Sequence, residues 1–240
     1  MKIGLVSSLM KDNDMLHQVE VMKNCLKHSK DYDLLCFGES FLQGFEGLTW
    51  DYKEDIKRAI DVKGPLMDTL KGLTKIYNCG ISFGFIEKEN HKLFSSNIVI
   101  NNNGDVVDLF RRVSKGWKES IATKDYLEGT GFHTFTYKDK VYATAICGDV
   151  WDDTFLEELL ELRIDALLWP LYIDFSMTAW HQQYLDEYLE RTSVLPYDVY
   201  MINSFVEDDN RSNGGCYVFR NGQVIGELSM GKMGVLTVEV

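Results

Sequence analysis

Residues 80–114, GISFGFIEKENHKLFSSNIVINNNGDVVDLFRRVS, decide the fold class. Three apolar, β-branched runs in this stretch predict three strands. They are joined by KENHK at 88–92 and NNNGD at 101–105, which are short turn signals. Connections this short favour antiparallel neighbours, so this part of the chain departs from the strand–helix alternation of a doubly wound sheet.

The flanking segments alternate between helical and strand patterns. Before the meander we expect a strand at 2–7, a helix within 14–29, a short strand within 32–40 and a helix within 64–80. After it we expect two strands within 132–147, a helix at 154–165, a buried strand at 166–172, a long amphipathic helix at 178–195, a strand at 199–205, a loop at 207–215, a hairpin at 215–228 turning at Asn221–Gly222, and a strand at 235–240.

This count, about a dozen strands and four or five helices, exceeds what one doubly wound sheet of 240 residues holds. The sequence therefore predicts an α/β protein of the α+β type, with two mixed sheets packed together and flanked by helices. No stretch resembles a linker, so we expect a single domain over residues 1–240.

Composition excludes several classes of function. The formal net charge of −12, from 37 acidic and 25 basic residues, would repel a phosphate backbone, so we expect no nucleic-acid partner. No run has the eighteen or so apolar residues of a membrane span, and MKIGLVSS lacks the apolar core of a signal peptide, so we expect a cytoplasmic protein. Five cysteines without zinc-ligand spacing predict free thiols, no metal and no cofactor.

One of these thiols ends a strand. Residues 143–151 read ATAICGDVW, and Cys147 stands where the apolar run meets Gly148. The carboxyl end of a strand is a common place for a reactive group, although a buried, inert cysteine is the alternative. A cysteine nucleophile needs a base, and none of the five histidines lies in an obvious functional motif.

Glu39 is the candidate base. It follows the apolar strand in LLCFGESFLQGF, where desolvation would raise its pKa toward a useful value; a turn or helix-start glutamate is the alternative. A third segment, LFRRVSKGWKES at 109–120, offers cations at the end of another strand. Lys115 or Lys118 would stabilise an oxyanion and Glu119 would orient the substrate, unless the segment is only a solvated strand exit.

The order of KIGLVSS, DLLCFGESFLQGF, GDVVDLFRRVSKGWKE and VYATAICGDVW resembles that of the nitrilase (carbon-nitrogen hydrolase) superfamily across essentially the whole chain. The resemblance implies a four-layer α-β-β-α sandwich, a homodimer or higher homo-oligomer, and a Glu-Lys-Cys triad formed by Glu39, a lysine near 115 and Cys147. It further implies hydrolysis of a small amide, ω-amide, N-carbamoyl compound or nitrile through a thioester, with Glu119 as a second glutamate.

Three positions depart from the family pattern. Gly38 replaces a proline, Gly148 replaces a tyrosine, and Arg112 occupies the lysine position. The lysine role therefore falls to Lys115, Lys118 or Arg112, with Lys115 narrowly preferred.

Two other classes of function compete with this interpretation. A nitrilase-fold binding or regulatory protein with a weakened site is the alternative to an enzyme. A metal-dependent phosphoesterase would need Asp/His ligand pairs that the sequence does not present.

Aromatic residues follow the candidate nucleophile. Around the pocket we expect an aromatic wall of Trp151, Trp169, Tyr172, Phe175 and Trp180, with Gly148 opening the pocket beside the nucleophile. The bulky stretch from Trp169 to Tyr172 indicates a small or flat substrate. A tryptophan-rich stretch that belongs only to the core is the alternative. The helix over 178–194 and the last strand are candidate interface elements, although core packing explains them equally well.

Overall fold

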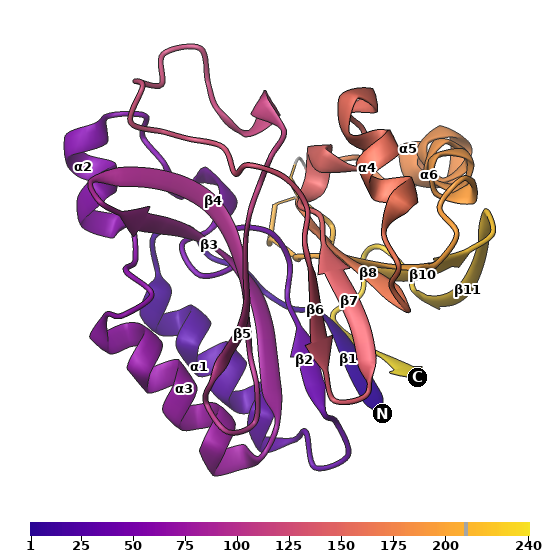
Figure 1. The fold of residues 1–240 in the computed structure, drawn as a ribbon, viewed down its shortest axis with the longest axis horizontal. Coiled ribbons are helices and arrows are strands. Elements are labelled where there is room, and N and C mark those ends of the chain that lie inside the picture. Colours follow the sequence, from indigo (N-terminus) through magenta and orange to yellow (C-terminus); the bar gives the residue numbers. More distant parts are fainter. Residues whose placement is uncertain (209–210) are drawn as a thin grey trace.

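Two six-stranded mixed sheets pack face to face in the computed structural model, which describes residues 1–208 and 211–240 (Figure 1). The first sheet, in the order β12-β1-β2-β3-β4-β5, contains β1 (Lys2–Ser7), β2 (Leu34–Cys36), β3 (Gly80–Glu89), β4 (Lys92–Ile100), β5 (Val106–Arg111) and β12 (Gly234–Glu239). The second, in the order β11-β10-β9-β8-β7-β6, contains β6 (Thr134–Tyr137), β7 (Lys140–Thr144), β8 (Ala166–Leu171), β9 (Asp198–Asn203), β10 (Cys216–Arg220) and β11 (Gln223–Leu228). The predicted two-sheet sandwich is confirmed. Residues 209 and 210, within the predicted loop at 207–215, lie outside the described residues.

The predicted meander is the antiparallel ribbon β3-β4-β5. Its first turn is at Asn90 and His91, whose φ angles of 48° and 61° lie in the left-handed region. Two such residues form the tight turn that matches the twist of a hairpin. The predicted turn at Asn221 and Gly222 has the same character, with φ angles of 50° and 69°.

Helices cover the outer face of each sheet. On the first sheet lie α1 (Met15–Lys27) and α3 (Pro65–Tyr77), and on the second lie α4 (Leu156–Glu161), α5 (Met177–Ala179) and α6 (Leu185–Ser193) (Figure 1). A short helix that the sequence did not predict, α2 (Tyr52–Arg58), begins where the Asp51 side chain accepts a hydrogen bond from the Lys53 N–H. Short 3₁₀ turns are at Phe45–Gly47, Lys115–Trp117, Cys147–Asp149 and Asp153–Phe155, and a π turn is at Trp180–Tyr184.

Two helices differ from the prediction, one in length and one in regularity. The predicted helix at 154–165 ends at Glu161, because Asp165 already exchanges hydrogen bonds with the backbone of Val141 next to β8. The predicted helix at 178–195 contains the π turn, which begins at the fully buried Trp180. The Trp180 Nε1–H donates to the Tyr217 hydroxyl over 2.9 Å, so burial of this ring accompanies the irregular turn.

The space between the sheets is filled by apolar side chains from both. The buried members include Ile3, Leu5, Leu34, Val99, Tyr142, Leu168, Tyr200 and Ile202. Alternate residues of each strand thus face the other sheet, and the remainder face the helices. Among the described helices, none is long and apolar enough to cross a membrane.

The two ends of α1 provide a matched test of this packing. Leu26 is 1% exposed, whereas Leu16 is 78% exposed. Leu26→Ala should lower the free energy of unfolding by about 2–5 kcal/mol, because it leaves a cavity beneath the helix. Leu16→Ala should change it by less than about 0.5 kcal/mol. Urea unfolding of both variants checks this, and equal losses would contradict the placement of α1.

Candidate active site

Cys147 lies on a sharp turn just after β7. Its φ angle is 44°, a left-handed conformation that costs a residue with a side chain on the order of 1–3 kcal/mol. Its carbonyl oxygen accepts a 2.9 Å hydrogen bond from Trp169 Nε1. Backbone strain at a strand exit that the surrounding contacts hold in place is typical of a functional residue.

Glu39 reaches the same place from β2. It is 1% exposed, and the chain passes so close to β3 that a Cβ on Gly84 would lie 2.7 Å from the Glu39 Cα. Glycine at 84 therefore permits this crossing. Burial raises the pKa of Glu39, and the neighbouring Arg112 and Cys147 oppose that rise.

Arg112 pairs with Glu39 in the interior. Its Nη1 lies 2.9 Å from Glu39 Oε1, and the Arg112 side chain is 4% exposed. Its Nε donates to Ser114 Oγ over 2.9 Å. Burial works against the charged guanidinium, but Glu39, Cys147 and Asp149 raise the pKa of Arg112 above its ordinary value. The pair is thus an ionic one, with Arg112 positively charged.

The thiol of Cys147 faces this pair. The pKa of Cys147 is raised to about 12, chiefly by burial and also by Glu39, while Arg112 and the backbone N–H of Tyr172 act in the opposite direction. The second oxygen of Glu39, Oε2, is buried and has no hydrogen-bond partner within the described part of the chain. A protonated thiol beside a carboxylate with a free oxygen is the arrangement that general-base activation needs.

Asp149 joins the two strand exits, a role that the sequence did not reveal. Its Oδ1 accepts hydrogen bonds from the backbone N–H groups of Val113 and Ser114 at 3.1 and 2.7 Å. Its Oδ2 accepts one from Ile146 at 2.8 Å. This carboxylate therefore fixes the segment after Arg112 against the turn that carries Cys147. An aspartate two residues after the cysteine was the available signal.

Neither candidate lysine is paired with Glu39, although Lys118 lines the same pocket. Lys115 is exposed on a 3₁₀ turn, and Lys118 donates to the Tyr126 carbonyl over 3.1 Å and pairs with Glu128. Among the described contacts, the cation paired with Glu39 is Arg112 and not a lysine. Glu119 is exposed, but it lines the pocket next to Glu39.

That pocket has a volume of about 220 Å³. Its walls include Glu39, Ser40, Phe45, Leu48, Trp50, Ile86, Ser95, Trp117, Lys118 and Glu119. The walls thus combine aromatic and apolar side chains with an about equal share of polar and charged ones, a mixture that can hold a small polar molecule. Phe45 and Trp50 come from the irregular segment after β2, which has no periodic pattern in the sequence.

The four predicted substrate contacts take different places. Gly148 lies against Arg112 and Ser114. Trp169 is fully buried behind the Cys147 carbonyl, and Trp151, 37% exposed, lies against it and lines a separate groove with Leu156 and Val194. Tyr172 stacks on Phe45 with ring centres 4.2 Å apart, so it supports the pocket wall from behind.

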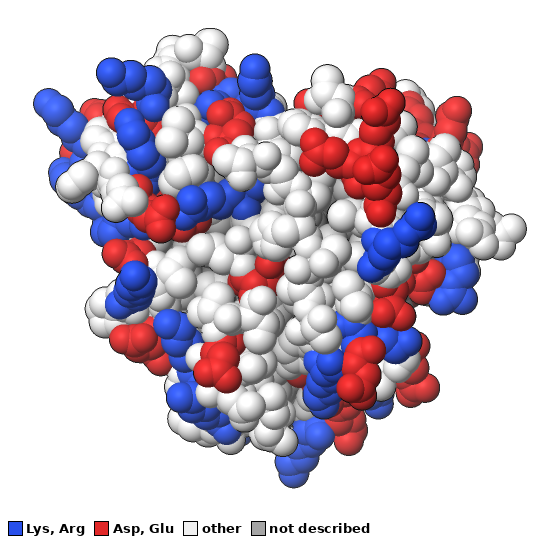
Figure 2. Space-filling model, viewed as in Figure 1, with Lys and Arg blue, Asp and Glu red and all other residues white. Residues whose placement is uncertain are grey.

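The surface around these strand exits is notched. Figure 2 shows acidic side chains gathered over α4, including Glu157 and Glu158, and more basic side chains on the opposite lobe, with uncharged surface between them. In Figure 1 the loop after β5 and helix α4 stand on the two sides of this notch. The described residues contain no group of three or more His, Cys, Asp or Glu side chains placed to hold a metal ion.

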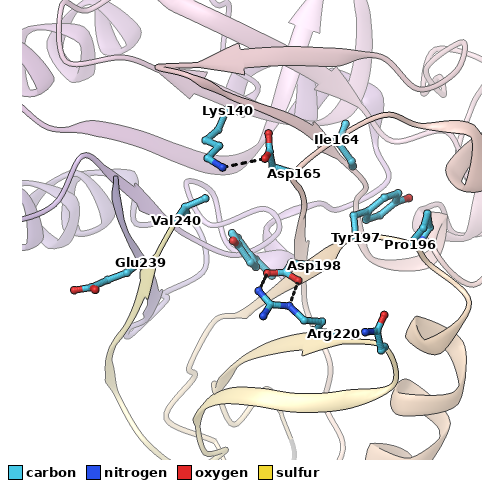
Figure 3. Close-up of a pocket in the computed structure, with 11 residues that line it drawn as sticks. Lys140, Ile164, Asp165, Pro196, Tyr197, Asp198, Arg220, Glu239 and Val240 are labelled. Carbon is cyan, nitrogen blue, oxygen red and sulfur yellow. Dashed lines mark hydrogen bonds and ion pairs between the residues drawn. The ribbon is translucent and has the colours of Figure 1, made fainter.

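A larger pocket, of about 480 Å³, lies at the opposite end of the second sheet (Figure 3). It contains the pair of Lys140 and Asp165 at 3.1 Å and the two-pronged pair of Arg220 and Asp198 at 2.6 Å. Lys140 begins β7, whereas Cys147 follows its end. This pocket is therefore separate from the group around Cys147.

Comparison with known proteins identifies the family. The carbon-nitrogen hydrolase family profile matches residues 8–240. A probable nitrilase from Schizosaccharomyces pombe is 26% identical over 194 residues, 78% of this chain and 66% of that protein. An arylacetonitrilase from Hypocrea virens is 27% identical over 85 residues, 32% of this chain and 26% of that protein. The matched region is less than two thirds of either relative.

Solved structures share the fold at low sequence identity. An amidase from Nesterenkonia sp. AN1 superposes with a TM-score of 0.80 at 14% identity, over 100% of this chain and 93% of the amidase. A CN-hydrolase superfamily protein from Xanthomonas campestris gives 0.81 at 17% identity, over 99% and 89% of the two chains. With the family profile covering nearly every residue, these observations show that the chain belongs to the carbon-nitrogen hydrolase (nitrilase) family.

Proposed function

We propose that this chain hydrolyses a C–N bond of a small amide, ω-amide or N-carbamoyl compound, with Cys147 as nucleophile, Glu39 as general base and Arg112 in the role expected of a lysine. The observation that carries the proposal is the buried contact of Arg112 Nη1 with Glu39 Oε1 at 2.9 Å, beside the Cys147 thiol. It brings a base, a cation and a nucleophile from three strand exits into one place.

In the first half-reaction the Cys147 sulfur attacks the carbonyl carbon, and the thiol proton passes to Glu39. The carbonyl oxygen becomes an oxyanion, which the Arg112 guanidinium stabilises by hydrogen bonding and charge. Collapse of this intermediate breaks the C–N bond, and the proton on Glu39 leaves with the amine. The product on the enzyme is a thioester at Cys147.

In the second half-reaction water attacks the thioester carbon while Glu39 accepts its proton. A second oxyanion forms and is stabilised by Arg112 in the same way. The acid leaves, and Glu39 returns the proton to the Cys147 sulfur. One amide and one water molecule thus give one acid and one amine, and no further reagent is needed.

The pocket supports a small substrate. Its volume of about 220 Å³ and its aromatic side chains, Phe45, Trp50 and Trp117, suit a compact acyl group with a flat or apolar part. Glu119 lines the pocket and is proposed to position the amine side of the substrate. A homodimer, implied by the family resemblance, stays a prediction.

A binding or regulatory role is the second candidate. The observation that favours it is the buried Glu39–Arg112 pair itself, because the guanidinium lowers the pKa that burial raises and so makes Glu39 a weaker base than burial alone would. The two functions differ in covalent chemistry: a hydrolase forms an acyl adduct on Cys147, and a binding protein does not.

Acyl-enzyme formation tests the mechanism directly. Intact mass spectra of the parent enzyme, quenched with acid during incubation with a panel of small amides, ω-amides, N-carbamoyl compounds and nitriles, should show an adduct on Cys147. Glu39→Gln should form this adduct far more slowly, because acylation and deacylation both need the base. Cys147→Ala should form no adduct and should lose turnover by at least about 1,000-fold. Full activity in Cys147→Ala would refute the mechanism, and no adduct with any compound would favour the binding role.

Substitutions at Arg112 and Lys115 test which of these two residues stabilises the oxyanion. Arg112→Met should lower kcat by about 100- to 1,000-fold, since an oxyanion donor is lost. Arg112→Lys should lose less, because the charge is kept. Lys115→Ala should stay within about twofold of the parent, since Lys115 is exposed. Steady-state kinetics decides, and a loss in Lys115→Ala as large as in Arg112→Met would restore the lysine assignment.

The pH dependence of the activity follows from Glu39. Its pKa is raised, so the ionised base is lost as the pH falls through a value above the ordinary glutamate value of about 4.3. The acid limb of kcat/KM should therefore have its midpoint above that value. The profile is measured from pH 4 to 9 with a substrate that does not titrate in this range. A midpoint at or below the ordinary value would contradict the desolvated site.

A further inference from the structure

Gly148 and Arg112 occupy adjoining space in the site. A Cβ built on Gly148 would lie 2.5 Å from Arg112 Nη2 and 3.3 Å from Ser114 Oγ. The first distance is shorter than any real carbon–nitrogen contact between unbonded atoms. Gly148 is not among the residues with positive φ, so its backbone does not itself demand glycine. The constraint at this position is therefore one of space.

The guanidinium has little freedom to move away from an added methyl group. Its Nη1 is held by Glu39 and its Nε by Ser114, both at 2.9 Å. The backbone of the same residue is fixed as well, by hydrogen bonds from Arg112 N to the Ser95 carbonyl and from Gly129 N to the Arg112 carbonyl. Displacing Nη2 would break charge-assisted hydrogen bonds in a buried site, which is costly.

We propose that Gly148 and Ser114 are positioning residues that together form the seat of Arg112, and that the absence of a side chain at 148 is what allows a guanidinium to take the lysine position. The importance of this arrangement for catalysis depends on the proposed function. The arrangement joins two departures from the family pattern, glycine after the nucleophile and arginine for lysine, as one steric adaptation. The terminal amine of a lysine is a single, narrower group than the fork of an arginine, so it does not impose the same limit at 148.

The seat controls the charge that Cys147 experiences. The titratable groups that act on the thiol are the anionic Glu39, the cationic Arg112 and the phenol of Tyr188, and Asp149 acts on Glu39 and Arg112 from behind. Of these, only Arg112 favours the thiolate by its charge. Moving the guanidinium away from its seat should therefore make the thiolate harder to form.

The rate at which iodoacetamide alkylates Cys147 reports how easily its thiolate forms, and the measurement needs no substrate. The rate is measured by peptide mass spectrometry from pH 7 to 10 in the parent, Gly148→Ala, Arg112→Lys and the double variant. Gly148→Ala should move the profile to higher pH, and a rise of about one pH unit in the thiol pKa slows alkylation about tenfold at a fixed pH below that pKa. In the Arg112→Lys background the same alanine should add less than about a twofold effect.

Gly116→Ala is the matched control. Its Cβ would meet the same Arg112 Nη2 atom, but at 3.6 Å, an ordinary contact distance. Alkylation of Cys147 in this variant should stay within about twofold of the parent. Thermal unfolding of every variant confirms that it is folded. If Gly148→Ala does not fold, Ser114→Ala removes the Nε acceptor without adding an atom and should slow alkylation in the same direction.

Three outcomes would contradict the proposal that Gly148 and Ser114 hold Arg112 in place. The first is an unchanged alkylation profile in Gly148→Ala. The others are an alkylation rate lowered equally by this alanine in the parent and in the Arg112→Lys background, or lowered equally in Gly116→Ala. The second would mean that the methyl group disturbs the turn at Cys147 and not the guanidinium. Failure of the proposed function looks different. No compound would then form an acyl adduct, while the alkylation rates would still decide whether Gly148 seats Arg112.

Discussion

The buried ion pair of Glu39 and Arg112 is the interaction on which the site depends. Both side chains are almost fully buried, and a buried charge without a partner destabilises a protein by about 3–5 kcal/mol. Neither residue is therefore free to change alone. Glu39 follows β2 and Arg112 follows β5, so the pair also holds together two strand exits of the first sheet that are not neighbours in it.

Cys147 belongs to the second sheet, and Asp149 connects it to this pair. The Asp149 carboxylate accepts backbone hydrogen bonds from Val113 and Ser114 on one side and from Ile146 on the other. Packing of the two sheets alone does not fix the conformation or the relative position of the loops at the ends of their strands. A buried carboxylate with three backbone donors removes that freedom, because each unmade bond would leave a polar group unpaired. Cys147 and Arg112 thus take their relative position from a residue that does not line the pocket.

Much of this arrangement could be predicted from the sequence, because strand periodicity and short turns are local. Cys147 and Glu39 were found as polar residues at the ends of apolar runs. The cation was harder: the motif register indicated Arg112, whereas the expected chemistry favoured Lys115. The physical reason for the difference is that Arg112 is still bonded to Ser95 at the end of β5, whereas Lys115 lies on a turn that faces solvent. Pocket residues such as Trp50 come from irregular backbone, where no period exists to predict their direction.

Arginine at this position has a chemical consequence beyond its shape. A lysine ammonium loses its proton readily when buried, so it can exchange protons with a reacting group. A guanidinium does not, and in this site its pKa is raised further by Glu39. Arg112 can therefore stabilise an oxyanion only through charge and hydrogen bonds. Every proton that moves in the proposed cycle must pass through Glu39, whose free oxygen Oε2 is the one available for it.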